Sequence, residues 1–317
     1  MAKRKKTNCI PGNEKYTIQD FNTEFPNDDA CLSFVLESRW PDGRTMCIKC
    51  GVEHKHYRVT GRTAFACDHC GNHIYPLAGT IFEKSTTSLR TWFYAMYLMG
   101  STRCGVSAKQ IQRETGVTYK TAWRIFKQIR TLMSEDVRLE GSAVEMDETY
   151  VGGTRRGTRG RPSGNDKQKA CVVGAVEREK GRVVALVADG ATRENLHGIA
   201  KEYVLPESII YTDEYPAYRG LDWIHGYDHR RINHSQGIYV VGDIHTNTIE
   251  GFWSLVKRGI GGVYHSVSRK YLQTYLDEYS FRYNRRNSGQ PMFVSLLEQI
   301  YERAEQPHAS RDHETLS

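Results

Sequence analysis

The chain has 317 residues, a length that favours two or three domains. Its 39% hydrophobic content excludes a wholly disordered chain, and its net charge is +7. No apolar run reaches the roughly 18 residues that a membrane span needs, and the basic first residues lead into polar sequence rather than an apolar signal core. We therefore expect a soluble, cytoplasmic, basic protein with no membrane partner.

The first 43 residues predict a lead-in followed by one helix. Residues 1–26 are polar and are interrupted by Pro11, Gly12 and Pro26, so we expect an irregular segment there. Asn27 and the two acids after it can cap a helix over 30–40, which a Pro-Asp-Gly turn would end.

Residues 44–80 predict a zinc ribbon. Four of the eight cysteines form two CxxC pairs, namely Cys47 with Cys50 and Cys67 with Cys70. The spacing between the pairs falls within the range of about 15 to 20 residues typical of zinc sites. A glycine follows each pair, Gly51 and Gly71, where a tight turn toward a metal favours that residue. Four thiolates would close a structural Zn²⁺ site, with redox pairs or disulfides as the alternative.

Residues 85–138 predict a helical, DNA-binding helix-turn-helix domain. Helices are expected at 89–99, 107–114 and 119–133, with a turn at Gly116 between the last two. The outward side chains of the last helix that suit phosphate and base-edge contacts include Lys120, Thr121 and Arg124. An ordinary helical hairpin is the alternative reading of this pattern.

The positive charge is concentrated in three blocks, 103–130, 154–169 and 252–286. Such blocks within folded sequence point to a polyanion, most often nucleic acid, although solvated helix faces produce the same pattern. The middle block places basic side chains among glycines, and we expect a loop that contacts DNA and orders on binding. Its predicted contact residues are Arg155, Arg156, Arg159 and Arg161.

From residue 141 the pattern changes to strands. Strands are expected at 143–150, 171–177, 182–188 and 208–212, with a helix at 193–204 before the last of them. Further helices are expected at 247–257, 268–283 and 293–303. This order predicts an α/β fold with a mixed sheet over 141–290, followed by a C-terminal helix and tail over 291–317.

Three acids and a lysine in this region suit divalent-metal chemistry. Asp147 lies on the strand face opposite Val144 and Met146, and Asp213 ends an apolar strand. Glu250 lies near a helix start, and Lys257 follows on the same helix face. Three carboxylates could hold two Mg²⁺ ions about 4 Å apart around a phosphodiester.

Each acid also has a structural alternative. Asp147 could be a turn residue at a strand end, and Asp213 could be a helix cap before Glu214, Tyr215 and Pro216. Asn247 and Glu250 are spaced as a capping box.

At these residues the sequence resembles the DDE insertion-sequence transposases with an N-terminal zinc ribbon, bacterial relatives of the Merlin transposases. The resemblance spans roughly 25–290. It is carried by RWP at 39–41, MDETYVGG at 146–153, YTDEY at 211–215, HTNTIEGFWS at 245–254, KRG at 257–259 and RYNRR at 282–286.

The resemblance implies an RNase H-like catalytic domain that integrates a mobile element. Asp147, Asp213 and Glu250 would be the metal ligands, with His245 and Asn247 as other candidates for the third position. Lys257 would contact the terminal DNA of the element, beside Arg258.

The resulting hypothesis is a DNA transposase. The ribbon and the helix-turn-helix would bind the terminal inverted repeats as double-stranded DNA. Two Mg²⁺ or Mn²⁺ ions would support cutting of the element ends and their joining to target DNA. A homodimer or larger assembly is expected, because two ends must be held together. The alternatives are a non-catalytic DNA-binding regulator and an RNase H-like nuclease that does not join.

Overall fold

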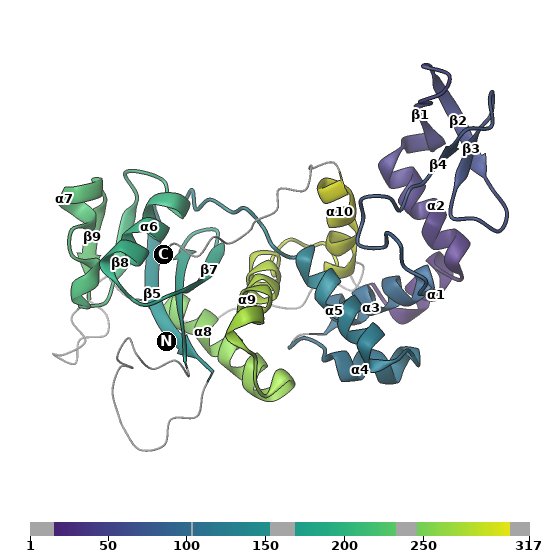
Figure 1. The fold of residues 1–317 in the computed structure, drawn as a ribbon. Coiled ribbons are helices and arrows are strands. Elements are labelled where there is room, and N and C mark those ends of the chain that lie inside the picture. Colours follow the sequence, from purple (N-terminus) through teal and green to yellow (C-terminus); the bar gives the residue numbers. More distant parts are fainter. Residues whose placement is uncertain (1–15, 103, 153–168, 233–245, 305–317) are drawn as a thin grey trace, which may run out of the picture. The chain divides into compact units, whose positions relative to one another are not determined.

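The computed structural model describes residues 16–102, 104–152, 169–232 and 246–304, and the elements can be followed in Figure 1. The chain forms two compact units. The first comprises Met1–Leu132 together with Gly289–Ser317, and the second comprises Met133–Ser288. Within the described ranges, no helix is both long enough and apolar enough to cross a bilayer.

The first unit combines a small antiparallel sheet with helices. In chain order its elements are α1 (Ile18–Glu24), α2 (Asp28–Arg39), a short 3₁₀ turn (Pro41–Gly43), β1 (Arg44–Met46), β2 (Glu53–Arg58), β3 (Phe65–Cys67), β4 (His73–Ile74), α3 (Leu89–Ser101), α4 (Ala108–Thr115), α5 (Tyr119–Thr131) and α10 (Met292–Ala304). The sheet order is β1-β2-β3-β4. The helices predicted from the sequence are all present, with ends that differ by a few residues.

The expected irregular lead-in over residues 1–26 is wrong for its last part, because α1 forms there. The Thr17 side chain accepts a hydrogen bond from the Asp20 amide, and the Asp20 carboxylate accepts one from the Thr17 amide at 2.7 Å. This reciprocal capping box, with Phe21 buried behind it, is the local signal that the sequence reading missed.

The C-terminal helix α10 belongs to the core of this first unit. Phe293 is 2% exposed, and its ring lies 5.9 Å from that of Phe21 and 6.0 Å from that of Phe25. A Cβ on Gly100 of α3 would lie 2.8 Å from the Phe293 backbone nitrogen. The absence of a side chain at Gly100 therefore lets α3 and α10 approach closely.

Replacing Phe293 by Ala should destabilise the first unit by about 3–5 kcal/mol, because a large aromatic ring is removed from a packed core. Thermal unfolding monitored by circular dichroism would measure the loss. Tyr75→Ala provides the control, since Tyr75 is 53% exposed and surface truncations cost little. A loss below about 1 kcal/mol for the Phe293 variant would contradict the burial of its ring in the core of the first unit.

The second unit is built on a five-stranded mixed sheet. In chain order its elements are β5 (Ala143–Val151), β6 (Ala170–Glu177), β7 (Val183–Ala188), α6 (Arg193–Tyr203), β8 (Ile209–Thr212), a 3₁₀ turn (Pro216–Tyr218), α7 (Leu221–His225), β9 (Asp228–Arg231), α8 (Asn247–Gly259), a π-helical turn (Ile260–Tyr264) and α9 (Arg269–Asn284). The sheet order is β7-β6-β5-β8-β9.

Strand directions identify the type of sheet. β5, β6 and β7 are antiparallel neighbours, whereas β8 and β9 run parallel to β5. The predicted mixed α/β sheet is thereby confirmed, and its order is that of an RNase H-like fold. The edge strand β9 was not predicted, because its residues are polar and largely exposed and lack the apolar pattern of a buried strand.

Helices cover both faces of this sheet. On one face Met146 packs with Leu196 of α6. On the other face Val172 packs with Phe252 of α8 and Leu276 of α9. Because neighbouring side chains of a strand point to opposite faces, Asp147 lies on the face covered by α8.

Candidate active site and zinc ribbon

The structure brings the two predicted aspartates together. Asp147 lies within β5 opposite Gly174, and Asp213 directly follows β8. Parallel pairing of Glu145 with Tyr211 places the two aspartates at the same level of neighbouring strands. Carboxylate oxygens of Asp147, Glu148 and Asp213 lie within 4.8 Å of one another. This arrangement can bind a divalent cation, for which carboxylate oxygens are suitable ligands.

Glu148 was not predicted as part of this group. Strand alternation by itself directs it away from Asp147, and it is only 8% exposed. The Tyr218 hydroxyl donates to its Oε2 at 2.9 Å. The sequence feature that could have indicated its role is its position directly after Asp147.

Glu250 lies in the first turn of α8 and is exposed. Its Oε1 accepts a hydrogen bond from the Thr246 hydroxyl at 3.1 Å, and its carboxylate does not join the group formed by Asp147, Glu148 and Asp213. Its negative charge nevertheless acts on Asp147. Lys257, two helical turns further on, is exposed and acts on Asp147 with the opposite sign.

The structural alternatives for the acids are met only in part. Asp213 supports the turn before the 3₁₀ turn at Pro216–Tyr218, because its Oδ1 accepts the Tyr215 amide at 2.9 Å, but the N-cap residue there is Tyr215. Asp147 is not a turn residue, since it lies inside β5. The capping box between Asn247 and Glu250 does not form, because the N-cap residue of α8 is Thr246, whose own side chain makes no capping hydrogen bond. Asn247 is exposed, and His245 lies outside the described residues.

The environment of Asp147 favours its neutral form. Burial is the main cause, and together with the negative charge of Asp213 it raises the pKa of Asp147 from 3.8 to about 7. The Trp253 indole N–H donates to Asp147 Oδ2 at 3.0 Å, which opposes this rise. Near neutral pH, a cation or a proton is therefore needed to offset the repulsion between the two neighbouring carboxylates.

The four cysteines of the ribbon also converge. The Sγ atoms of Cys47 and Cys70 are 3.6 Å apart, and those of Cys50 and Cys67 are 4.0 Å apart. A tetrahedral zinc ion with Zn–S bonds of 2.3 Å would require about 3.8 Å between sulfurs. All four sulfurs lie within 4.8 Å of one another, so the geometry fits a four-thiolate site.

Backbone turns present these sulfurs as the sequence predicted. Gly51 and Gly71 have φ angles of +68° and +70°, which non-glycine residues rarely adopt. Each amide donates to the carbonyl oxygen of the first cysteine in its pair, at 2.8 and 3.0 Å. His69 also lies beside the site, with its Nδ1 atom 3.5 Å from Cys50 Sγ.

Comparison with known proteins finds matches over the two regions that contain these sites. The chain matches the ISXO2-like transposase domain over residues 138–284 and the transposase zinc-ribbon domain over residues 26–73. It is 30% identical over 277 residues to an uncharacterized protein in transposable element ISH50 of Halobacterium salinarum, a match that covers 81% of this chain and 91% of that protein. The chain belongs to the ISXO2-like DDE transposases.

Two further similarities accompany this assignment. The transposase is 31% identical over 121 residues to an uncharacterized transposase-like protein of Haemophilus influenzae, covering 38% of this chain and 94% of that one. Among solved structures, the HTLV-2 integrase catalytic core domain in complex with magnesium matches with a TM-score of 0.30 and 14% identity, covering 52% of this chain and 99% of that one.

The helix-turn-helix of the transposase has the predicted local form. Ser107 caps α4, Thr118 caps α5, and Gly116 between them adopts the left-handed conformation with φ of 72°. Ile111 and Ile125 are fully buried. Two short capped helices around a glycine turn therefore form as their sequence indicates.

The predicted DNA-contact side chains differ in how they are held. Lys120 is exposed, whereas the Thr121 hydroxyl lies 3.0 Å from that of Thr118. Arg124 donates to the Ser85 hydroxyl at 2.8 Å and lies 5.7 Å from the Trp92 ring centroid.

The other predicted DNA contacts fall in the second unit. Lys257 and Arg258 are both exposed near the end of α8. Four further predicted contacts lie outside the described residues, namely Arg155, Arg156, Arg159 and Arg161.

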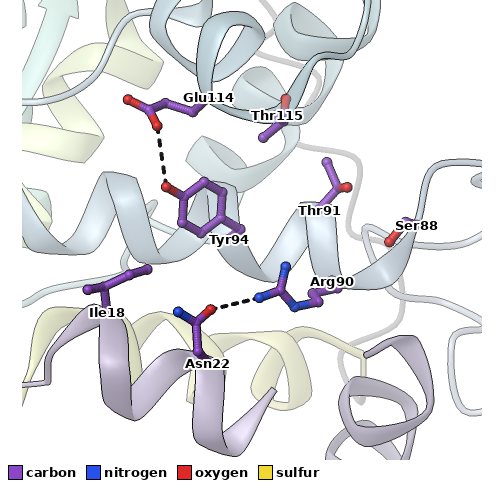
Figure 2. Close-up of a pocket in the computed structure, with 8 residues that line it drawn as sticks. All are labelled: Ile18, Asn22, Ser88, Arg90, Thr91, Tyr94, Glu114 and Thr115. Atoms are coloured by element: carbon purple, nitrogen blue, oxygen red, sulfur yellow. Dashed lines mark hydrogen bonds between the residues drawn. The ribbon is translucent and has the colours of Figure 1, made fainter. Parts of the chain in front are cut away.

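A polar pocket of about 410 Å³ lies in the first unit between α1, α3 and α4 (Figure 2). Across it, the Arg90 guanidinium donates to Asn22 Oδ1 at 2.7 Å, and the Tyr94 hydroxyl donates to Glu114 at 3.4 Å. These pairs tie the neighbouring helices to α3. The lining contains none of the predicted site residues, so we assign the pocket no part in catalysis.

Gly174 determines how closely α8 approaches the acids. A Cβ at this position would lie 2.6 Å from the Trp253 ring, so the bare backbone makes room for the indole that contacts Asp147. Gly174→Ala should therefore displace Trp253 and destabilise the second unit by about 1–3 kcal/mol.

Thermal unfolding and tryptophan fluorescence would measure this change. Gly251→Ala is the matched control, because nothing lies within 4 Å of a Cβ added there and alanine favours the helix. Equal stability of the Gly174 variant and the wild type would contradict the tight contact.

Proposed function

We propose that this transposase cuts the ends of a mobile element and joins them to target DNA, with two Mg²⁺ or Mn²⁺ ions held by Asp147, Asp213 and Glu250. The observation that carries the proposal is the convergence of the partly buried Asp147 with Asp213, beneath the helix that bears Glu250. The match to a DDE transposase domain over 138–284 supports the same reading.

The chain's own residues would have distinct parts. Asp147 and Asp213 would bind the ions from neighbouring strands, while the Trp253 indole orients the Asp147 carboxylate. Glu250 would complete the set from α8, and Lys257 on the same face would contact the terminal DNA. When bound, the metal ions supply Lewis acidity that activates the attacking hydroxyl group and neutralises the leaving oxygen.

We further propose that residues 44–80 and 85–138 bind the terminal inverted repeats as double-stranded DNA. The four cysteines would hold one structural Zn²⁺ ion, and Lys120, Thr121 and Arg124 of α5 would contact the DNA. The exposed Lys257 and Arg258 would contact it beside the catalytic acids. A homodimer or larger assembly would hold both element ends.

An end-joining assay tests the proposal. Purified protein is incubated with Mg²⁺, labelled DNA carrying the element end and a plasmid target. We expect labelled end DNA joined to the plasmid, and we expect Asp213→Asn to lose it. Asp222→Asn, which changes an exposed aspartate of α7, should retain joining.

Two other outcomes would contradict the proposal in different ways. DNA that is bound but unaltered would indicate a non-catalytic regulator. DNA that is cut at the element end but never joined would indicate an RNase H-like nuclease.

A further inference from the structure

We infer that the largely buried ion pair between Glu145 and Arg178 positions the three acids of the metal site relative to one another. The inference rests on the proposed function. Glu145 and Arg178 do not belong to the proposed ligand set. They form a layer beneath it that contacts each of the three elements carrying an acid.

The Glu145 carboxylate joins β5 to α8. It is fully buried, and its Oε2 accepts the amides of Thr248 at 2.8 Å and Ile249 at 3.0 Å. Its Oε1 accepts the Thr248 hydroxyl at 2.9 Å. A negative charge at a helix N-terminus is favourable, and these bonds satisfy amides that the helix itself leaves unpaired. Glu145 therefore caps α8 immediately before Glu250.

Arg178 extends this link to β8. Its Nε donates to Glu145 Oε1 at 2.8 Å, and its guanidinium lies 3.7 Å from the ring centroid of Tyr211. Tyr211 is 4% exposed and pairs with Glu145 in the parallel register of β8 and β5. The pair thus fixes β8 two residues before Asp213.

The spacing places this layer on the same face as the acids. Glu145 precedes Asp147 by two residues, and Tyr211 precedes Asp213 by two residues, so side-chain alternation directs each pair to one side of the sheet. On α8 the contacted amides directly precede Glu250. A shift of any of the three elements would therefore strain the ion pair and move an acid.

A charged pair here has a more specific effect than apolar packing would have. Buried ion pairs contribute little net stability, but their geometry is directional, and breaking one partner is costly. The flat guanidinium can hydrogen-bond a carboxylate and stack on a ring at once, which a lysine cannot do. The expected consequence is a defined separation of the acids before the metal binds.

Glu177 provides a matched control. It is as buried as Glu145 and also accepts a backbone amide, that of Gly141 at 2.9 Å. It pairs with Val144, so it points to the opposite face of the sheet. Glu177→Gln should therefore cost stability without disturbing the metal site.

The test compares Glu145→Gln and Arg178→Lys with Glu177→Gln. The first readout is the Mg²⁺ concentration that gives half of the Mg²⁺-induced rise in the unfolding midpoint, measured with Mg²⁺ alone. The second is the Mg²⁺ dependence of end joining. We expect the first two variants to need about tenfold more Mg²⁺ in both assays, because groups that orient metal ligands typically change metal affinity by 10- to 100-fold. Glu177→Gln should need the wild-type concentration.

Several outcomes would overturn the inference. Wild-type Mg²⁺ dependence in Glu145→Gln and Arg178→Lys would do so, as would an equal shift in Glu177→Gln. Arg178→Lys keeps the positive charge, so it serves as the test if Glu145→Gln does not fold. Mg²⁺ should raise the unfolding midpoint of the wild type but not that of Asp147→Asn. If this difference is not seen, the proposed metal site itself is wrong, and this inference is wrong with it.

Discussion

Replacing Asp147 by Asn is expected to abolish end joining and, at the same time, to stabilise the metal-free transposase near pH 8. The pKa of Asp147 is raised from 3.8 to about 7, chiefly by burial and then by Asp213. Between these two values the folded state holds a proton that the unfolded chain has released, so stability falls as the pH rises through that window. The stabilisation that protonated Asp147 gives the folded state is fully present below about pH 4 and is lost as the pH passes 7.

Asparagine avoids this cost because it carries no charge and can still accept the Trp253 hydrogen bond. A difference of about 3 pKa units corresponds to at most about 4 kcal/mol at pH 8. With a shift of about 2–4 °C per kcal/mol for a unit of this size, the unfolding midpoint should rise by several degrees.

Thermal unfolding of wild type and variant at pH 5 and pH 8, without added Mg²⁺, would measure the effect. The variants should differ at pH 8 and converge toward pH 5, while Asp222→Asn should behave as wild type. Adding Mg²⁺ at pH 8 should stabilise only the wild type, since the neutral amide is a poor ligand. A wild-type protein that becomes more stable between pH 5 and pH 8 relative to the variant would contradict the prediction.

Replacing Cys67 by Ser should unfold the zinc ribbon. Apart from its cysteines, the small sheet β1-β2-β3-β4 and its turns bury few apolar side chains. Those that are buried include Ala64, Phe65 and Ile74. A bound structural zinc ion supplies on the order of 10 kcal/mol to such small domains, so losing one thiolate removes most of their stability. We expect loss of bound zinc and fast amide exchange over 44–74.

Zinc content and hydrogen exchange would measure this result. Cys104→Ser is the control, because Cys104 is exposed and lies outside the ribbon. A different result would indicate that the cysteines form disulfides instead. In that case the purified wild-type protein would contain no zinc, and a thiol reductant would unfold the ribbon. End joining and DNA binding should both be lost in the Cys67 variant, whereas Asp147→Asn should still bind DNA.

Much of the zinc ribbon and of the aspartate pair could be predicted because their signals are local. Two closely spaced cysteines with a glycine after them already describe a metal-binding turn, and Gly51 and Gly71 adopt the required backbone. The alternation around Asp147 gives its face of the sheet directly. The position of Asp213 follows from its place at the end of an apolar strand.

The elements and contacts that were not predicted lack such local signals, or lie in segments whose polar composition does not indicate a helix or strand. The exposed edge strand β9 has no apolar pattern, and α1 is short and begins with a capping box that polar composition concealed. Glu148 joins Asp147 and Asp213 although simple alternation points it elsewhere. Five of the predicted site residues contribute nothing to this comparison because they lie outside the described ranges, namely Arg155, Arg156, Arg159, Arg161 and His245.

The amino-acid sequence alone indicated the family resemblance, most of the helices and strands, the four clustered cysteines and the two aspartates, because these features rest mainly on local sequence patterns. Only the tertiary structure decided that Glu145 caps α8, that Gly174 admits Trp253, and that α10 packs on α3. These contacts join segments that are far apart in the chain, and whether they form depends on the packing of complete elements rather than on any local pattern.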